Sequence, residues 1–131
     1  LAKAIDNNNI YICDLNYSNG LIVSGSQRTV NLPSTKSLEG LEFSPDGNYL
    51  YYSYHGLLNK VGYLANLSSG AVLTPVDYLD FNVGFIEVAH DERIYFSEYP
   101  GDHLISKVNP DSPNSGFLST NAVNLEDDFF F

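Results

Sequence analysis

The sequence predicts an all-β fold, and three observations carry this prediction. A segment at residues 41–53 recurs at residues 86–97, which gives a repeat of about 45 residues. Gly, Pro, Asn and Asp separate short apolar runs, and the aromatic residues are ten Tyr and eight Phe, which favour strands. No stretch keeps the helical spacing of apolar residues over about ten positions.

Each copy of the repeat contains an apolar strand, a tight turn, an aromatic strand, a Gly-containing turn and a third strand. In the tight turn, Asp46 and Asp91 are 45 positions apart. In the strand that follows, Tyr51 and Tyr95 are 44 positions apart. This order of elements is that of an antiparallel meander.

The expected strands can be placed in order along the chain. Residues 9–15 read like the third strand of a repeat, and a turn at 16–20 leads into a strand at 21–23. Val61 and Ile105 are predicted to be counterparts in the third strands of the two later copies, 44 positions apart. The remaining strands are expected at residues 41–44, 49–53, 59–64, 86–89, 94–97 and 103–108.

The tight turn of the first full copy follows from its residue types. Pro45 fixes φ for a tight turn, Asp46 accepts hydrogen bonds from the amides that follow, and Gly47 takes a left-handed position. The run after the turn, residues 49–53, is almost entirely aromatic and apolar. That run predicts a strand buried on both faces.

About four strands in each period of about 45 residues are typical of a β-propeller blade. The chain is therefore predicted to be a single β-propeller segment, with a partial blade at residues 1–35, blades at 36–80 and 81–125, and a tail at 126–131. Rings contain roughly four to eight blades, so about two and a half to three blades cannot close one. We therefore expect further blades in a longer chain or assembly with other copies. Because the sequence does not begin with Met, we also expect a processed chain or a fragment.

The order of three segments resembles one bacterial family. Residues 38–47 read Leu-Glu-Gly-Leu-Glu-Phe-Ser-Pro-Asp-Gly, residues 85–95 read Phe-Ile-Glu-Val-Ala-His-Asp-Glu-Arg-Ile-Tyr, and residues 107–111 read Lys-Val-Asn-Pro-Asp. Over about residues 8–118, this order is similar to the propeller regions of gliding-motility-associated and type IX-secreted surface proteins of Bacteroidota-like bacteria.

The second turn departs from that family, whose turn reads Asp-Gly-Lys-Ile-Tyr, because Glu92 and Arg93 replace the Gly and the Lys. A Cys that often follows the Asn-Pro of the family is also missing. The resemblance implies an extracellular or cell-surface module whose blades serve as a scaffold or binding surface. It supplies no catalytic residue.

The acidic composition narrows the class of partner. Sixteen acidic residues against six basic ones give a net charge of −10, which argues against DNA, RNA or an anionic membrane surface. No apolar run approaches the roughly 20 residues of a membrane-spanning helix, and residues 1–4 do not read as a signal peptide. Cys13 is the one cysteine; it lies in an apolar run and is expected to be a buried free thiol.

Histidines are the first residues to test as metal ligands or bases. His55, His90 and His103 have neither the paired spacing of a zinc-binding helix nor a Cys partner. We therefore expect turn or surface histidines and no metal site.

Acidic and hydroxyl side chains give no motif either. Asp46 and Asp91 occupy equivalent turns, from which they either converge on a metal at a propeller axis or, as we expect, cap their own turns. Residues 126–128 and 111–116 lack the ligand order of a calcium loop and are expected to be a charged tail and a solvated loop. Residues 24–26 are expected to form a loop, and neither a Gly-x-Ser-x-Gly elbow nor a phosphate-binding loop occurs, so no catalytic residue or cofactor is predicted.

Two further motifs remain. The sequons at Asn16 and Asn66 lie in predicted turns that can accommodate a glycan, although we expect them to be chance matches. The aromatic tail, Phe129 to Phe131, is expected to pack against a further blade or to mark where a longer chain was cut.

Together these features predict a noncatalytic propeller scaffold or binding module of a secreted or cell-surface bacterial protein, with a protein or glycan partner. Two alternatives stay open. A lactonase-like or hydrolase-like propeller enzyme would hold a metal in a way that depends on Asp46 or Asp91. A subunit of an extracellular polymer would join open sheet edges between copies.

Overall fold

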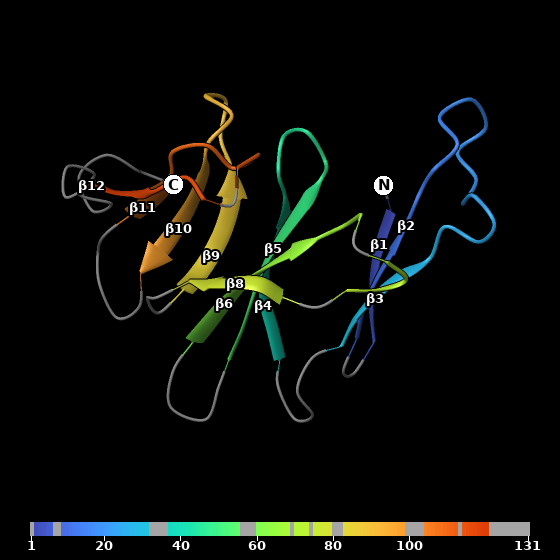
Figure 1. Ribbon diagram of the computed structural model, residues 1–131, viewed down its shortest axis with the longest axis horizontal. Coiled ribbons are helices and arrows are strands. Elements are labelled where there is room, and N and C mark those ends of the chain that lie inside the picture. Colours follow the sequence, from blue (N-terminus) through green and yellow to red (C-terminus); the bar gives the residue numbers. More distant parts are fainter. Residues whose placement is uncertain are drawn as a thin grey trace, which may run out of the picture.

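The computed structural model describes residues 2–6, 9–31, 37–55, 60–68, 70–73, 75–79, 83–98, 104–112 and 114–120. All regular structure in these ranges is β, in three four-stranded sheets that we call the first, middle and last sheets (Figure 1). The described ranges contain no helix that could cross a membrane. The all-β prediction is therefore confirmed.

The first sheet combines segments that are far apart in the sequence. Its strand order is β1 (Ala2–Asp6), β2 (Asn9–Cys13), β3 (Arg28–Asn31) and β7 (Val72–Leu73). The first three strands pair antiparallel, whereas β3 and β7 run parallel, with Thr29 opposite Val72. A piece of chain that follows the third strand of the middle sheet therefore forms an edge of the first sheet.

The middle and last sheets are simple meanders. The middle sheet has the order β4 (Ser37–Phe43), β5 (Tyr49–His55), β6 (Lys60–Asn66) and β8 (Pro75–Leu79). The last sheet has the order β9 (Val83–Val88), β10 (Ile94–Glu98), β11 (Leu104–Lys107) and β12 (Phe117–Thr120). All their strand pairs are antiparallel.

One apolar core joins the first sheet to the middle sheet. Residues from β2, β3 and β7 contact residues from β5 and from the end of β6, and all are at least nine-tenths buried: Ile10, Ile12, Val30, Leu50, Tyr52, Tyr54, Ala65, Leu67 and Leu73. Alternate residues of β2 and β5 supply this core, as the two-residue period of a strand requires.

A second core joins the middle sheet to the last sheet. Tyr51, on the other face of β5, packs against Ile86, Ile94, Phe96 and Ile105. The Tyr51 and Phe96 rings are tilted by 59° with centroids 5.9 Å apart. Strand β5 is therefore buried on both faces, which confirms the prediction made from residues 49–53.

Corresponding residues face the same way in successive sheets. Leu50 and Tyr52 of the middle sheet face the first sheet, and Ile94 and Phe96, 44 positions later, face the middle sheet. The two pairs of sheets therefore stack in the same sense, front to back. Within the described residues no strand of the last sheet pairs with a strand of the first.

Gly40 of β4 lets the last sheet approach the middle sheet closely. A Cβ at Gly40 would lie 2.9 Å from Ile86 Cγ1, 2.9 Å from Ser53 Oγ and 3.2 Å from the Ile86 backbone nitrogen. Phe85, 45 positions later, is 78% exposed. The packed face of the middle sheet thus has an uncovered counterpart on the last sheet.

The turn lengths explain why the repeat spacing changes from 45 to 44. In the middle sheet, the Ser44 backbone N–H bonds to the Tyr49 carbonyl, 2.9 Å away, and closes a loop of residues 45–48. In the last sheet, the Ala89 N–H bonds to the Arg93 carbonyl, also at 2.9 Å, so the loop is one residue shorter. The turn alone accounts for the one-residue difference, so corresponding side chains of the flanking strands still point to the same side of their sheets.

Both turns need a residue in the left-handed region. Gly47 has φ of 74° and Glu92 has φ of 61°. Glycine adopts this conformation without steric penalty, whereas a glutamate does not. Glu92, the counterpart of Gly47 in the last sheet, therefore has a strained backbone conformation.

Two details of the expected strands are wrong. Val61 pairs with Tyr54, but Ile105 pairs with Phe96, the counterpart of Tyr52, so the third strands correspond with a shift of two residues. Residues 21–23 form an isolated bridge, through Ile22, rather than a strand, because β3 is the strand that pairs with β2.

Candidate functional site

The Asp46 carboxylate is used inside its own turn. Its Oδ1 accepts hydrogen bonds from the Asn48 backbone N–H at 2.9 Å and the Ser44 hydroxyl at 2.7 Å, and its Oδ2 accepts one from the Asn48 side-chain amide at 2.7 Å. Partial desolvation raises the pKa of Asp46, but the bonds from Asn48 and Ser44 outweigh it and hold the pKa below its usual value.

Asp91 is used in the same way in the last sheet. Its Oδ1 accepts the Arg93 backbone N–H at 3.1 Å and its Oδ2 accepts the Tyr95 hydroxyl at 2.8 Å. The bond from Tyr95 lowers the pKa of Asp91, and the Asp91 carboxylate in turn raises the pKa of Tyr95. The prediction that both aspartates cap their own turns is confirmed.

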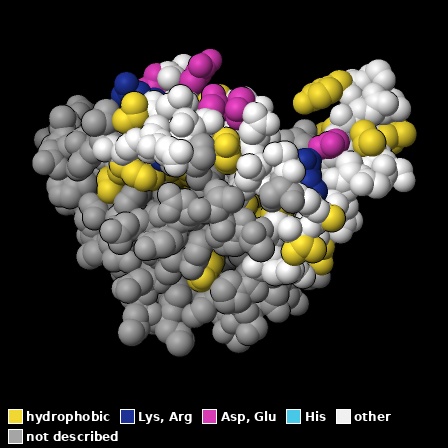
Figure 2. All heavy atoms as spheres, viewed as in Figure 1, with side chains coloured by type: hydrophobic (Ala, Val, Ile, Leu, Met, Phe, Trp, Pro, Cys, Tyr) yellow, Lys and Arg dark blue, Asp and Glu magenta, His cyan; other side chains and the backbone are white. Residues whose placement is uncertain are grey.

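A third carboxylate, that of Asp111 in the loop after β11, contacts the turn that contains Asp46. Its Oδ1 accepts the Asp46 backbone N–H at 2.9 Å. Desolvation and the carboxylates of Asp46 and Glu92 raise the pKa of Asp111. Acidic side chains gather at the top of the view (Figure 2), yet in the described part of the chain no group of three His, Cys, Asp or Glu residues could hold a metal ion.

The loop after β11 seals the second core. The buried Tyr51 hydroxyl donates to the Pro110 carbonyl at 2.8 Å. Lys107 is 98% buried and lies 4.4 Å from the centre of the Phe117 ring, and its ammonium donates to the Ser115 carbonyl. Residues 111–116 were expected to be a solvated loop, and those that the structure describes, 111, 112 and 114–116, are exposed or half-buried; the buried residues beside the core, Lys107 and Pro110, precede them.

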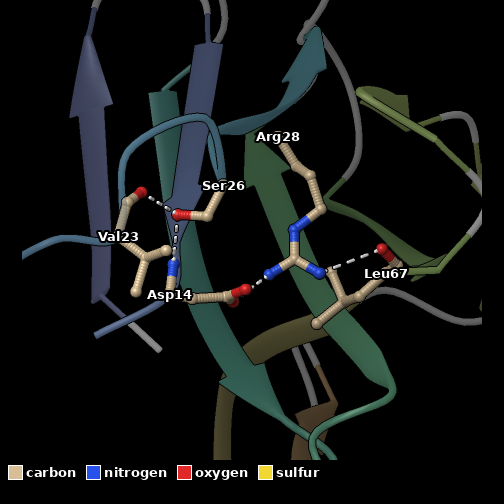
Figure 3. Close-up of polar contacts among 5 residues, drawn as sticks. All are labelled: Asp14, Val23, Ser26, Arg28 and Leu67. Atoms are coloured by element: carbon tan, nitrogen blue, oxygen red, sulfur yellow. Dashed lines mark hydrogen bonds and ion pairs between the residues drawn. The ribbon is translucent and has the colours of Figure 1, made fainter. Parts of the chain in front are cut away.

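A shallow groove of about 330 Å³ lies between the first and middle sheets. Arg28 crosses it, bonding to Asp14 Oδ1 at 2.6 Å and to the Leu67 carbonyl at 3.2 Å (Figure 3). Ser26 accepts the Asp14 backbone N–H at 3.0 Å and donates to the Val23 carbonyl at 2.6 Å. Because its hydroxyl donates to a carbonyl and no base contacts it here, Ser26 is held as a structural residue of the loop predicted at 24–26.

Of the histidines and the cysteine, the structure describes the surroundings of His90 and Cys13. His55 ends β5, His90 is exposed in the β9–β10 turn, and His103 lies outside the described residues. Cys13 is half-buried rather than buried, because Ile10 and Ile12 occupy the face of β2 that enters the core. The tail at 126–131, with its acidic and aromatic groups, also lies outside the described residues.

An asparagine turn recurs after one strand of each sheet. Asn16, Asn66 and Asn109 each accept, through Oδ1, the backbone N–H of the residue two positions later, at 3.0, 2.9 and 3.1 Å. These turns follow β2, β6 and β11. The sequence shows these turns as Asn-Tyr-Ser, Asn-Leu-Ser and Asn-Pro-Asp, but it predicts the first two as sequons and the third as part of the family resemblance, not as one recurring turn.

No protein-family model, curated protein or solved structure matches the chain.

Proposed function

We propose that the chain is a run of β-propeller blades that acts as a noncatalytic scaffold or binding module in a secreted or cell-surface bacterial protein. The observation that carries the proposal is the front-to-back stacking of the sheets. Leu50 and Tyr52 face the preceding sheet, and so do their counterparts Ile94 and Phe96. Sheets that repeat one stacking operation generate a ring if each step adds a constant rotation.

The recurrent asparagine turns support the same proposal. They make β2 the counterpart of β6 and β11, which are the third strands of the middle and last sheets. On this alignment β1, β2 and β3 are the second, third and fourth strands of a blade. The boundaries proposed at residues 35 and 80 then separate β3 from β4 and β8 from β9, while β7 of the segment 36–80 crosses to the first sheet.

A noncatalytic role is supported by what the turn carboxylates already do. Asp46 and Asp91, on which the metal-dependent alternative relies, each have both oxygens engaged by donors of their own turns. These bonds take up part of the acceptor capacity of each carboxylate and leave fewer lone pairs for a metal ion. The surface location and the choice of a protein or glycan partner rest on the bacterial family that the sequence resembles.

The proposal is tested in two measurements. Electron microscopy of the natural full-length protein should show the sheets arranged around a common axis, and a flat stack would refute the blade arrangement. A glycan array and calorimetric titration with Ca²⁺ and Zn²⁺ test the role. Saturable glycan binding without metal uptake supports a binding module, whereas metal binding that Asp46→Asn or Asp91→Asn abolishes would replace it with the metal-dependent enzyme.

A further inference from the structure

The connection between β2 and β3 is a small, well-bonded hairpin that projects from the first sheet (Figure 1). Backbone bonds join Asn16 N to Leu21 O at 2.8 Å, Gly20 N to Asn16 O at 2.7 Å and Val23 N to Asp14 O at 2.8 Å. Its shape is therefore fixed before any partner arrives. We call residues 14–26 the β2–β3 hairpin.

The hairpin displays large apolar side chains to solvent. Tyr17 is 93% exposed, Leu21 65%, Ile22 61% and Val23 43%. Hydrophobic side chains are visible on the projecting part of the molecule (Figure 2). Single exposed apolar residues are ordinary, but four on one short hairpin form a patch of the kind that marks an interaction site.

The hairpin is also one of the uncharged stretches of an acidic chain. No charged residue lies between Asp14 and Arg28, and these two neutralise each other across 2.6 Å. Elsewhere a net charge of −10 makes two copies repel each other. Two hairpins can meet without bringing carboxylates together.

Charge and shape distinguish the possible occupants. The hairpin has no Lys or Arg of its own, and Arg28 at its base is held by Asp14 and the Leu67 carbonyl, so attraction to anionic lipid is absent. The four residues together expose on the order of 500 Å², so two copies would bury at most about 1,000 Å² in total, which is the size of a weak, transient contact.

We propose that the β2–β3 hairpin is a self-association surface, which packs against the same hairpin of a second copy around a two-fold axis. The contact is apolar and preorganised, and the acidic remainder of both copies opposes it. Association is therefore weak, in the high micromolar range, and becomes stronger as salt screens the repulsion. The contact needs only the hairpin and not the ring, so it can fail or hold independently of the proposed function.

The test is sedimentation velocity of the chain over a range of concentrations, in about 0.05 M and 0.5 M NaCl. The expected result is a monomer–dimer equilibrium that shifts toward dimer in the higher salt. The double variant Leu21→Ser/Ile22→Ser should weaken association at least tenfold. The matched control is Val72→Ser, which removes an apolar side chain of similar exposure, 60%, outside the hairpin and should leave association unchanged.

Three results would overturn the proposal: a single-chain mass at every concentration, association that weakens with salt, or equal association of the double variant and the wild type. Flotation with phosphatidylcholine vesicles covers the lipid alternative, and vesicle binding that the double variant loses would assign the hairpin to membranes instead. All three substituted side chains are exposed, so unchanged urea midpoints confirm that every variant is folded.

Discussion

Gly40→Ala tests the close contact between the middle and last sheets. The added Cβ would lie 2.9 Å from Ile86 Cγ1 and from Ser53 Oγ, and 3.2 Å from a backbone nitrogen. Neither neighbour is the free end of a flexible side chain, since Ser53 is fully buried and Ile86 is 8% exposed. Overpacking of this kind costs about 1–3 kcal/mol of unfolding free energy.

The assay is urea unfolding at equilibrium, with Gly116→Ala as the control. Gly116 has no atom within 4 Å of its would-be Cβ and is not in the left-handed region, so this change should be neutral or stabilise by up to about 1 kcal/mol. Ile86→Ala should cost less in the Gly40→Ala background than in the wild type, with a coupling energy of at least about 0.5 kcal/mol in the double-mutant cycle. If Gly40→Ala and Gly116→Ala are equally stable, the sheets do not meet as described.

Three further predictions concern the turns and the loop that seals the second core. Glu92→Gly relieves a left-handed glutamate with φ of 61° and should raise the unfolding free energy by about 1 kcal/mol, measured in urea; a decrease would contradict the strain. Asp91 has a folded pKa below its unfolded one, so its contribution to stability is complete above about pH 4 and is lost as the pH falls through the folded value. The wild type should therefore lose more melting temperature than Asp91→Asn between about pH 7 and pH 3, and equal losses would argue against that shift. Tyr51→Phe removes the buried bond to the Pro110 carbonyl and should cost about 1 kcal/mol in urea unfolding, whereas no loss would mean that the bond is not formed in solution.

The sequence predicted the features that depend on local chemistry. The burial of β5 on both faces and the turn around Asp46 follow from side-chain type and backbone preference within a few residues. The structure confirms both predictions. Capping by Asp91 was predictable for the same reason, since it repeats the turn at Asp46.

The features that the sequence did not predict correctly depend on contacts between distant segments. Cys13 lies in an apolar run, but the core accepts only alternate residues of β2, and Ile10 and Ile12 are the ones that face it. The pairing of β7 with β3 could not be predicted from the sequence of a two-residue strand. It depends on how the first and middle sheets pack together. The hairpin was expected as a turn and a strand, and its apolar exposure became visible only when β3 took the place beside β2.

The parallel pairing of Thr29 with Val72 has a consequence for synthesis on the ribosome. At roughly 5–20 residues per second, the chain needs about two to nine seconds to add the residues that separate the two positions. During that interval the outer edge of β3 has no partner, and an unpaired strand edge is where a nascent chain joins a neighbour. Arg28 at the start of β3 and its partner Asp14 are both synthesised before this interval, so one end of the open edge carries a polar ion pair instead of apolar side chains.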